Sequence, residues 1–315
     1  MSIYNKTEIG RVAQQYGFTR DTFEKVLRLK EVLKYLNEDE FLREHLLLKG
    51  GTAINLTVFD LPRLSVDIDM DYMPNDEKEN MLLVREKITM LIKAYMDKEG
   101  YQLSQGSRFM HSLDAFYYQY TNVGGNRDML KIEINYSLRA HIFQPVYQKI
   151  LPKAFDDGML IQTVAPMEIF AAKGNALISR AAARDLYDWG NMIKTELFEH
   201  DRDMFRKCFV FYATISAEKV NRNFDTSAID SLNFLKIRRE LFPVLNRKDN
   251  FDLEERKRQA KDYITNLMQL TEQECEYMDR FIRKEYMPEL LFDDTDICER
   301  ICRHPMAIWK CQYSG

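Results

Sequence analysis

The sequence predicts an α+β protein, in which a mixed β-sheet flanked by helices extends to about residue 165 and a helical C-terminal domain follows. Residues Leu64–Tyr72 alternate strictly between apolar and polar side chains, which is typical of a half-buried strand. Two further strands are predicted at Leu113–Thr121 and Met129–Leu138, joined by a turn that contains two glycines. After Pro166 the apolar residues recur at helical intervals and no later strand is convincing.

The other elements follow from the same spacing rules. The opening segment to about Leu48 is predicted to be helical, and Glu79–Glu99 returns to helical spacing after the first strand. A short strand is predicted at Met159–Val164. Pro166 suits the first turn of a helix, so we expect two domains, residues 1–165 and 166–315.

Composition limits the classes of function. The chain has 315 residues, of which 45% are apolar, and can build a sizeable core. Its net charge of -4 argues against a protein that coats nucleic acid through bulk charge, so any RNA contact requires a local basic patch. The N-terminus lacks the apolar stretch of a signal peptide, no window is apolar enough to span a membrane, and five cysteines fit reduced thiols. We therefore expect a cytoplasmic protein with no membrane segment.

A pair of glycines stands before a helix-like stretch and forms the first candidate site. Gly50 and Gly51 lie between Lys49 and Thr52, and the sequence AINLTVF follows. Glycines in this position let a phosphate approach backbone N–H groups at the positive end of a helix dipole. A plain turn is the alternative interpretation of a lone Gly-Gly pair.

Two aspartates on the first predicted strand form the second candidate site. Asp67 and Asp69 are two residues apart, so their carboxylates point the same way and repel each other unless a cation lies between them. Magnesium suits such a pair, because it takes hard oxygen ligands and completes its octahedron with triphosphate oxygens. A second metal ion would activate the acceptor hydroxyl. A solvated strand face is the alternative.

A third carboxylate is expected on a neighbouring strand. Glu133 lies on the polar face of the Met129–Leu138 strand and could complete the metal site. The alternative is a surface pair between Glu133 and Lys131, which share that face.

A basic helical stripe supplies the local positive patch. Steps of seven and four residues put Lys173, Arg180 and Arg184 on one helical face, if the helix runs unbroken that far. These cations could hold a triphosphate and offset the charge of phosphoryl transfer. Asp188 could orient Lys173 or contact a base, with Asp185 beside it. The alternatives are a solvated helix face and an Arg184–Asp188 helical pair.

An aromatic strand offers a weaker candidate for nucleobase stacking. Phe116, Tyr117, Tyr118 and Tyr120 fall within Leu113–Thr121. Aromatic strand residues are more often simply packed in a core.

In this order, the motifs closely resemble those of the AbiEii/AbiGii-type nucleotidyltransferase toxins of bacterial abortive-infection and toxin–antitoxin systems. The resemblance covers about residues 40 to 195 and is carried by KGGTAINLTVFDLPRLSVDIDMDY, then KIEI, then APMEIFAAKGNALISRAAARDLYDWGNM. It implies a polymerase-beta-like fold, Mg²⁺ or Mn²⁺ in its place, a nucleoside triphosphate donor and, for several members, an RNA acceptor such as the 3′ end of tRNA. It also implies a cognate antitoxin encoded nearby, which need not bind the toxin directly.

The resemblance assigns roles residue by residue. The family's glycine motif falls on Gly50, Gly51 and Thr52, where the wider superfamily usually has Gly-Ser, and a threonine hydroxyl can make the same phosphate hydrogen bond. It places the family's serine and metal carboxylates at Ser65, Asp67 and Asp69, its essential lysine at Lys173 and its later aspartate at Asp188. Taking the residue patterns and the resemblance together, we expect metal ligands at Asp67, Asp69 and Glu133 and catalytic residues at Asp67, Asp69, Lys173 and Asp188. The nucleotide-binding residues are expected at Lys49, Gly50, Gly51, Thr52, Arg63, Ser65, Lys173, Arg180, Arg184 and Asp185.

The sequence thus predicts an enzyme that moves a nucleoside monophosphate from a nucleoside triphosphate to RNA. Residues 1–165 would form the nucleotidyltransferase domain with its N-terminal helices, and residues 166–315 would complete the nucleotide and acceptor cleft. One rival is a nucleotidyltransferase that modifies a small molecule, as antibiotic-modifying enzymes do. The other is a nucleotide-binding protein that kept the fold and lost activity.

Overall fold

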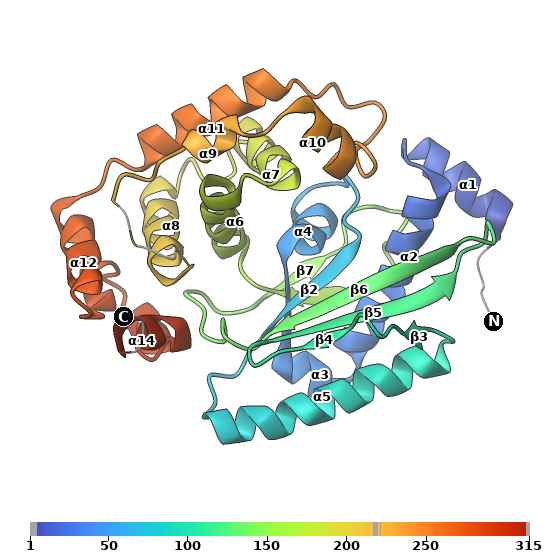
Figure 1. The fold of residues 1–315 in the computed structure, drawn as a ribbon, viewed down its shortest axis with the longest axis horizontal. Helices are drawn as coiled ribbons and strands as arrows, with labels where there is room; N and C mark the ends of the chain where they lie inside the picture. The colour runs from blue at the N-terminus through green and yellow to red at the C-terminus, as the bar shows by residue number, and fades with distance from the viewer. Residues whose placement is uncertain (1–4, 217–219, 221, 313–315) are drawn as a thin grey trace. The chain divides into compact units, whose positions relative to one another are not determined.

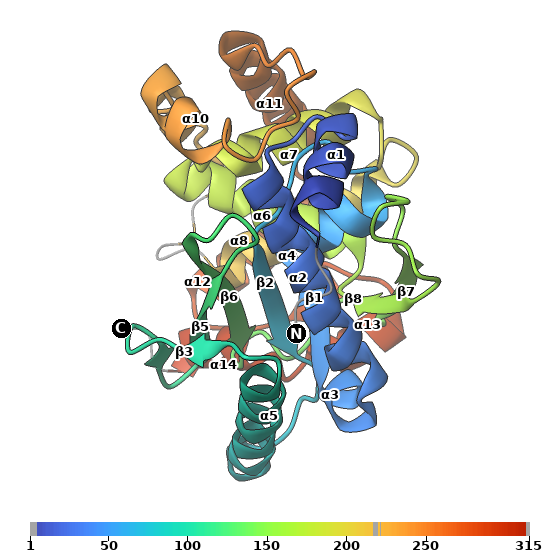
Figure 2. The same ribbon diagram turned by 90° about the vertical axis from the view of Figure 1, so that its right-hand side faces the viewer.

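A mixed eight-stranded sheet organises the first part of the chain in the computed structural model, which describes residues 5–216, 220 and 222–312 (Figure 1). The strand order is β3-β5-β6-β2-β1-β8-β7, with β4 also paired to β5, and Figure 2 shows this order across the sheet. The strands are β1 (Leu46–Lys49), β2 (Asp67–Tyr72), β3 (Gln102–Leu103), β4 (Arg108–Phe109), β5 (Leu113–Thr121), β6 (Arg127–Asn135), β7 (Val146–Lys149) and β8 (Leu160–Thr163).

The centre of the sheet combines parallel and antiparallel pairs. Strand β2 runs antiparallel to β1 and parallel to β6. In this register Asp69 lies between Lys49 on β1 and Glu133 on β6. The predicted mixed sheet is therefore confirmed, and its central strand carries the Asp67 and Asp69 pair.

Strand β1 corrects the prediction that the opening segment is helical to about Leu48. Leu46, Leu47 and Leu48 are all buried between β2 and β8. A short apolar run of this kind fits a fully buried strand and a buried helix equally well by periodicity, and here the two neighbouring strands decide the outcome.

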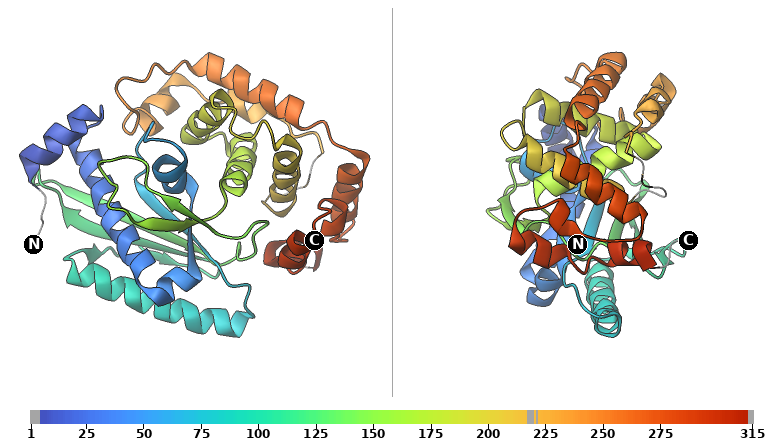
Figure 3. Two further views of the ribbon diagram at one scale, coloured as in Figure 1. Left: turned by 180° about the vertical axis from the view of Figure 1, so that it is seen from behind. Right: turned by 90° about the vertical axis from the view of Figure 1, so that its left-hand side faces the viewer.

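The described part of the sheet unit also contains helical segments: α1 (Lys6–Gln15), α2 (Arg20–Glu38), α3 (Glu40–His45), α4 (Gly50–Ala53), a π-helical turn (Ile54–Val58) and α5 (Lys78–Lys98). Helix α2 crosses the sheet and contacts β2 and β8, as the view from behind shows (Figure 3). The rings of Tyr35 on α2 and Tyr95 on α5 stack with centroids 3.9 Å apart, which joins these two helices.

Contacts divide the chain into two units whose sequences interleave. The sheet unit contains the described residues up to Arg139, Pro145–Thr163 and Pro243–Asp249. The helical unit contains Ala140–Gln144, Val164–Phe242 and the described residues from Asn250 onward. The predicted division at residue 165 therefore misses two short segments, here called the exchanged segments. Ala140–Gln144 belongs to the helical unit, and Pro243–Asp249 belongs to the sheet unit.

The helical unit consists of helices and their connections. They are α6 (Pro166–Arg180), α7 (Ala183–Lys194), α8 (Arg202–Ser216), α9 (Ser227–Asp230), α10 (Phe234–Glu240), α11 (Leu253–Leu267), α12 (Glu272–Ile282), a 3₁₀ turn (Pro288–Leu290), α13 (Thr295–Ile301) and α14 (Pro305–Gln312). Among the helices that the structure describes, none is both long and apolar enough to cross a membrane.

A glycine allows close packing in the core of the helical unit. The indole Nε1 of Trp189 on α7 donates a hydrogen bond to the carbonyl of Phe170 on α6 at 3.0 Å. A Cβ atom at Gly174 would lie 2.1 Å from the Trp189 ring and 2.4 Å from the Phe209 ring. Because both rings are fully buried, they have little room to move aside.

We expect Gly174→Ala to destabilise the protein by about 1–3 kcal/mol, because overpacking of a filled core outweighs the better helix propensity of alanine. Thermal unfolding would measure the change. Gly10→Ala is the matched control, because Gly10 also lies within a helix but an added Cβ would meet only an Arg20 side-chain atom at 4.0 Å. The control should be neutral or gain about 0.5–1 kcal/mol, and an equal gain at Gly174 would contradict the packing argument.

Candidate active site

The glycine motif packs directly against the aspartate pair. Gly50 begins α4 after β1 and has a φ of +70°, a conformation that glycine adopts without strain. A Cβ atom at Gly50 would lie 2.5 Å from Asp69 Oδ2. The chain therefore places the start of α4 in contact with the Asp69 carboxyl group, and a side chain at position 50 would occupy that space.

Gly51 makes a second close approach to residues from the segment before β2. A Cβ atom there would lie 2.8 Å from both Arg63 Nη2 and Ser65 Oγ. Arg63 is almost completely buried, and its guanidinium donates to the Leu64 carbonyl at 3.0 Å. The structure thus brings together the predicted residues Gly50, Gly51, Arg63, Ser65 and Asp69.

One hydrogen bond holds α4 on strand β2, and a second lies within the helical stretch that begins with α4. The buried Thr52 hydroxyl donates to the backbone carbonyl of Asp67. Asn55 Nδ2 donates to the Gly51 carbonyl at 2.8 Å. Thr52 therefore positions the glycine motif relative to Asp67. The sequence predicts that the Thr52 hydroxyl binds a phosphate, and it does not predict this contact.

Strand β2 begins at Asp67, three residues later than predicted. Leu64 donates its N–H to the Val244 carbonyl at 2.7 Å, and Arg63 forms an isolated bridge with Leu245. The segment before Asp67 therefore pairs with the exchanged segment Pro243–Asp249 and not with the sheet. No sequence pattern indicated this long-range partner.

The carboxylates of β2 lie on the polar side of the strand, with Ile68 and Met70 buried between them in the sequence. Burial, followed by the negative charge of Asp67, raises the pKa of Asp69 from its ordinary value of 3.8 to about 6. The charge of Glu133 raises this pKa further, whereas Lys49 and Lys131 lower it. Asp69 therefore stands in a local excess of negative charge.

Glu133 lies opposite Asp69 in the register but has a cationic partner. Its carboxylate is 2.7 Å from Lys131 Nζ. Burial lowers the pKa of Lys131, but its hydrogen bond to Glu133 and the charges of Glu133, Asp67 and Asp69 raise that pKa more. The predicted Lys131–Glu133 pair is thus present beside the aspartates. Within the described ranges, no three His, Cys, Asp or Glu side chains are grouped closely enough to hold a metal ion.

Lys49 pairs with the third aspartate of β2. Its Nζ forms a short ion pair with Asp71 Oδ1, and Asp71 is almost completely buried. The predicted nucleotide-binding lysine therefore lies beside the glycine motif with its ammonium directed to a carboxylate in this structure.

The predicted basic stripe does not lie on one helix, because the helix breaks after Arg180. Ala181 adopts a left-handed conformation with a φ of 48° and ends α6, and α7 begins at Ala183. The expectation that Lys173, Arg180 and Arg184 share one helical face is therefore wrong. An alanine gives no sequence signal for this turn, since left-handed residues are normally glycine or asparagine.

The break turns α7 so that two of its aspartates face Lys173. Lys173 Nζ is 2.7 Å from Asp185 Oδ1 and 2.9 Å from Asp188 Oδ2. Both carboxylates are nearly inaccessible, and the lysine side chain is 13% exposed. The predicted role of Asp188 as a partner of Lys173 agrees with this geometry, and Asp185 takes an equal part.

The two arginines flank this cluster in different ways. The exposed Arg180 reaches Asp185 Oδ2 at 3.6 Å. Arg184 Nε donates to the carbonyl of Glu240 at 2.9 Å and so connects α7 to α10. The helical unit thus carries four of the predicted site residues and the catalytic candidate Asp188 in two adjoining helices.

The aromatic strand is not a stacking surface. Phe116, Tyr118 and Tyr120 are buried in the sheet unit, and only Tyr117 of the predicted four is partly exposed. The strand's alternation places these three rings in the core, where aromatics favour packing.

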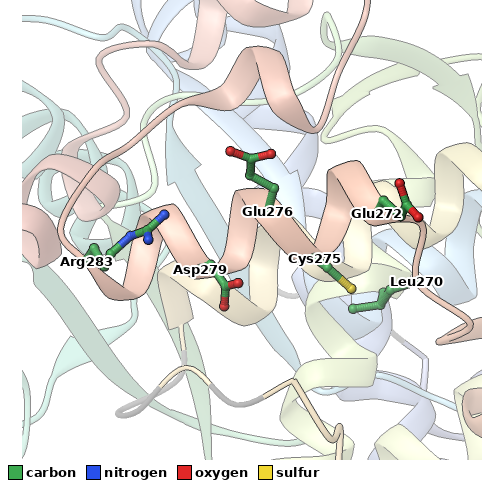
Figure 4. Close-up of a pocket in the computed structure, with 6 residues that line it drawn as sticks. All are labelled: Leu270, Glu272, Cys275, Glu276, Asp279 and Arg283. Carbon is green, nitrogen blue, oxygen red and sulfur yellow. The ribbon is translucent and has the colours of Figure 1, made fainter.

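A surface depression lies elsewhere in the helical unit, on α12 (Figure 4). None of its lining residues is a predicted site residue. They are Leu270, Glu272, Cys275, Glu276, Asp279 and Arg283.

The sequence did not point to two further contributors to these sites. Asn55 holds the Gly51 carbonyl, and an asparagine inside an apolar helical stretch was its only signal. Lys131 stands close enough to Asp67 and Asp69 for their charges to raise its pKa, whereas its position two residues before Glu133 predicts only a surface pair.

Known proteins that resemble this chain identify its family. Residues 31–281 match the family described as nucleotidyl transferase AbiEii toxin, type IV toxin–antitoxin system. Among curated proteins, no sequence matches the chain. Among solved structures, the nucleotidyltransferase toxin MenT4 from Mycobacterium tuberculosis H37Rv is similar, with a TM-score of 0.65 and 14% identity over 97% of this chain and 99% of that one. The structural likeness extends over the fold, and the family match covers both units. The chain belongs to the AbiEii family of nucleotidyltransferase toxins of type IV toxin–antitoxin systems.

Proposed function

We propose that this chain transfers a nucleoside monophosphate from a nucleoside triphosphate to the 3′ end of an RNA, with tRNA as the acceptor class, and does so with Mg²⁺ in the cytoplasm. The family supports a nucleotidyltransferase. The observation that supports the proposal is the close approach of Gly50 to Asp69, because a helix start can bind a phosphate and a pair of carboxylates can bind a divalent metal ion.

The donor set fits magnesium. The raised pKa of Asp69 marks a place where added positive charge would be favourable. Mg²⁺ is usually held by one or two carboxylates, with waters and substrate phosphates as its other ligands. Asp67 and Asp69 would therefore suffice as the protein ligands. When bound, Mg²⁺ or Mn²⁺ supplies charge neutralisation and activation of the acceptor hydroxyl.

The chain's own residues supply binding and orientation. The start of α4 offers backbone N–H groups to a phosphate, and Ser65 Oγ lies beside Gly51 as a further donor. Lys173, held by Asp185 and Asp188, offers a fixed cation for the triphosphate. A pre-positioned lysine has less conformational freedom to lose when a ligand binds.

The family description names a type IV toxin–antitoxin system, which supports the presence of an antitoxin. We propose a cognate antitoxin encoded near the toxin. Direct contact between the two proteins is not required for this assignment.

We expect Asp67→Asn and Asp69→Asn each to reduce label transfer at least about 100-fold, because each removes a ligand of the cation that offsets phosphoryl charge. The assay incubates the purified chain with Mg²⁺, each labelled triphosphate in turn and total RNA. Asp60→Asn, an exposed aspartate of the same unit, is the matched control and should retain activity.

The same assay tests Glu133 and the acceptor. Glu133→Gln should reduce transfer if this side chain binds metal and should leave it nearly unchanged if the Lys131 pair is its whole role. Label on a small molecule and not on RNA would contradict the RNA acceptor. Triphosphate-dependent stabilisation without any product would contradict transferase activity.

Lys173→Met should both inactivate and destabilise the protein. It leaves the buried Asp185 and Asp188 carboxylates without their ammonium partner, a loss of about 3–5 kcal/mol. Adding Asp188→Asn removes one of these charges and should recover part of the thermal stability while activity stays at least about 100-fold down. Recovery of activity together with stability would show that the lysine is only structural.

The free energy of unfolding of the metal-free protein should change with pH as Asp69 loses its proton. Because its folded pKa of about 6 lies above the ordinary 3.8, the folded protein binds this proton more tightly than the unfolded chain does. The stabilising effect is present at low pH and is lost as the pH rises from about 4 to about 6. Asp69→Asn should therefore gain up to about 3 kcal/mol relative to wild type between pH 4 and pH 7 in EDTA.

Added Mg²⁺ provides the second half of this measurement. At pH 7.5 it should raise the unfolding midpoint of wild type more than at pH 5, where Asp69 carries a proton more often. It should raise the midpoint of Asp69→Asn much less. Equal Mg²⁺ shifts in both proteins would place the metal elsewhere.

A further inference from the structure

Helix α10 presents large apolar and basic side chains on its outer face. Its inner face is buried through Ile237 and Leu241. The outer face, here called the α10 surface, consists of Phe234, Leu235, Arg238, Arg239 and Phe242, all of which are exposed. Their spacing of one and four residues follows the helical repeat, so they share one side of the helix and the turn after it.

The exposed rings of the α10 surface have no core to fill. Phe234 is 59% exposed, Leu235 is 73% exposed and Phe242 is 41% exposed. The two phenylalanine rings meet edge to face with centroids 5.8 Å apart. Clustered exposed apolar side chains mark interaction sites more often than isolated ones do.

Helix α10 as a whole is also basic, although the whole chain has a net charge of -4. Lys236, Arg238 and Arg239 fall within four residues, and Glu240 is the one acidic neighbour inside the helix. Glu240 pairs with Arg239 at 2.6 Å. Within the described part of the chain, Arg238 makes no ion pair. Positive charge is therefore concentrated where the aromatic rings are exposed.

Two hydrogen bonds attach helix α10 to the break between α6 and α7 and to the start of α7. Lys236 Nζ donates to the Ala181 carbonyl at 2.8 Å, and Arg184 Nε donates to the Glu240 carbonyl at 2.9 Å. Helix α10 accordingly contacts α7, beside which it is seen in Figure 2. Arg180, the last residue of α6, lies 3.6 Å from Asp185, and Asp185 in turn pairs with Lys173.

We propose that the α10 surface binds the single-stranded end of the acceptor RNA, with Arg238 and Arg239 on phosphates and the rings of Phe234 and Phe242 stacked on bases. This inference rests on the proposed function for the identity of the ligand. Aromatic rings stack on bases that are not paired, and arginines add phosphate and cation–π contacts. A protein partner would also use exposed apolar residues, but the excess of cations beside the rings favours a polyanion.

The test is RNA binding without catalysis. Fluorescence anisotropy would measure the affinity of the full chain for a short labelled single-stranded RNA and for a blunt-ended RNA duplex, in EDTA and without triphosphate. The salt dependence of each affinity would be recorded, because it reports the phosphate contacts.

We expect two distinct effects. Arg238→Glu with Arg239→Glu should weaken binding of the single strand at least about tenfold at low salt and lower the salt slope by about 1. Phe234→Ala with Phe242→Ala should weaken single-strand binding about tenfold, with little change in the salt slope or in duplex binding. The matched control is Lys194→Glu with Arg303→Glu, two exposed cations of the same unit, which should retain binding.

Circular dichroism and thermal unfolding establish that each variant is folded before binding is compared. Unchanged single-strand affinity in both α10 variants, or an equal loss in the control, would overturn the assignment. So would binding of an antitoxin protein at this surface with no effect on RNA. If wild type labels RNA while the α10 variants keep its KM for RNA, the inference fails and the proposed function stands. If the wild type labels no RNA but the α10 variants bind RNA more weakly than the wild type does, the proposed function fails and the α10 assignment stands.

Discussion

The contact between Gly50 and Asp69 constrains everything around it. Helix α4 can approach strand β2 this closely because position 50 has no side chain and tolerates a positive φ. Thr52 then holds the helix on the strand through its hydrogen bond to the Asp67 carbonyl, and Asn55 donates to the Gly51 carbonyl within the helical stretch. A phosphate at the helix start and a cation at the carboxylates would thus meet in one small volume, which is the requirement of nucleotidyl transfer.

Most of the site in the sheet unit could be predicted from the sequence, because its signals are local. Strict alternation placed Asp67 and Asp69 on the same face of a strand, and the two glycines marked a close approach before a helix. Alternation also placed Glu133 on the polar face of a second strand, but only the register of the sheet showed that Glu133 lies opposite Asp69. The family match confirmed the nucleotidyltransferase prediction.

The rest depended on contacts that are distant in sequence. Residues Leu46 to Leu48 form a strand because two other strands enclose them, and periodicity does not separate that case from a buried helix. The turn at Ala181 has no glycine to announce it, yet it decides that Asp185 and Asp188 both face Lys173. The sequence also contained no sign that the α10 rings are exposed, because apolar residues at helical spacing are normally predicted to lie in the core.

The interleaving of the two units has a consequence for synthesis of the chain. Val244 and Leu245 pair with Leu64 and Arg63 just before β2, and Asn246 donates to the Tyr16 carbonyl at 3.0 Å. These contacts cannot form until the ribosome has released residues far beyond the sheet. Asp67 and Asp69 are therefore translated early, whereas the contacts of the segment just before them form late. The sheet unit cannot complete these contacts until most of the chain has been synthesised.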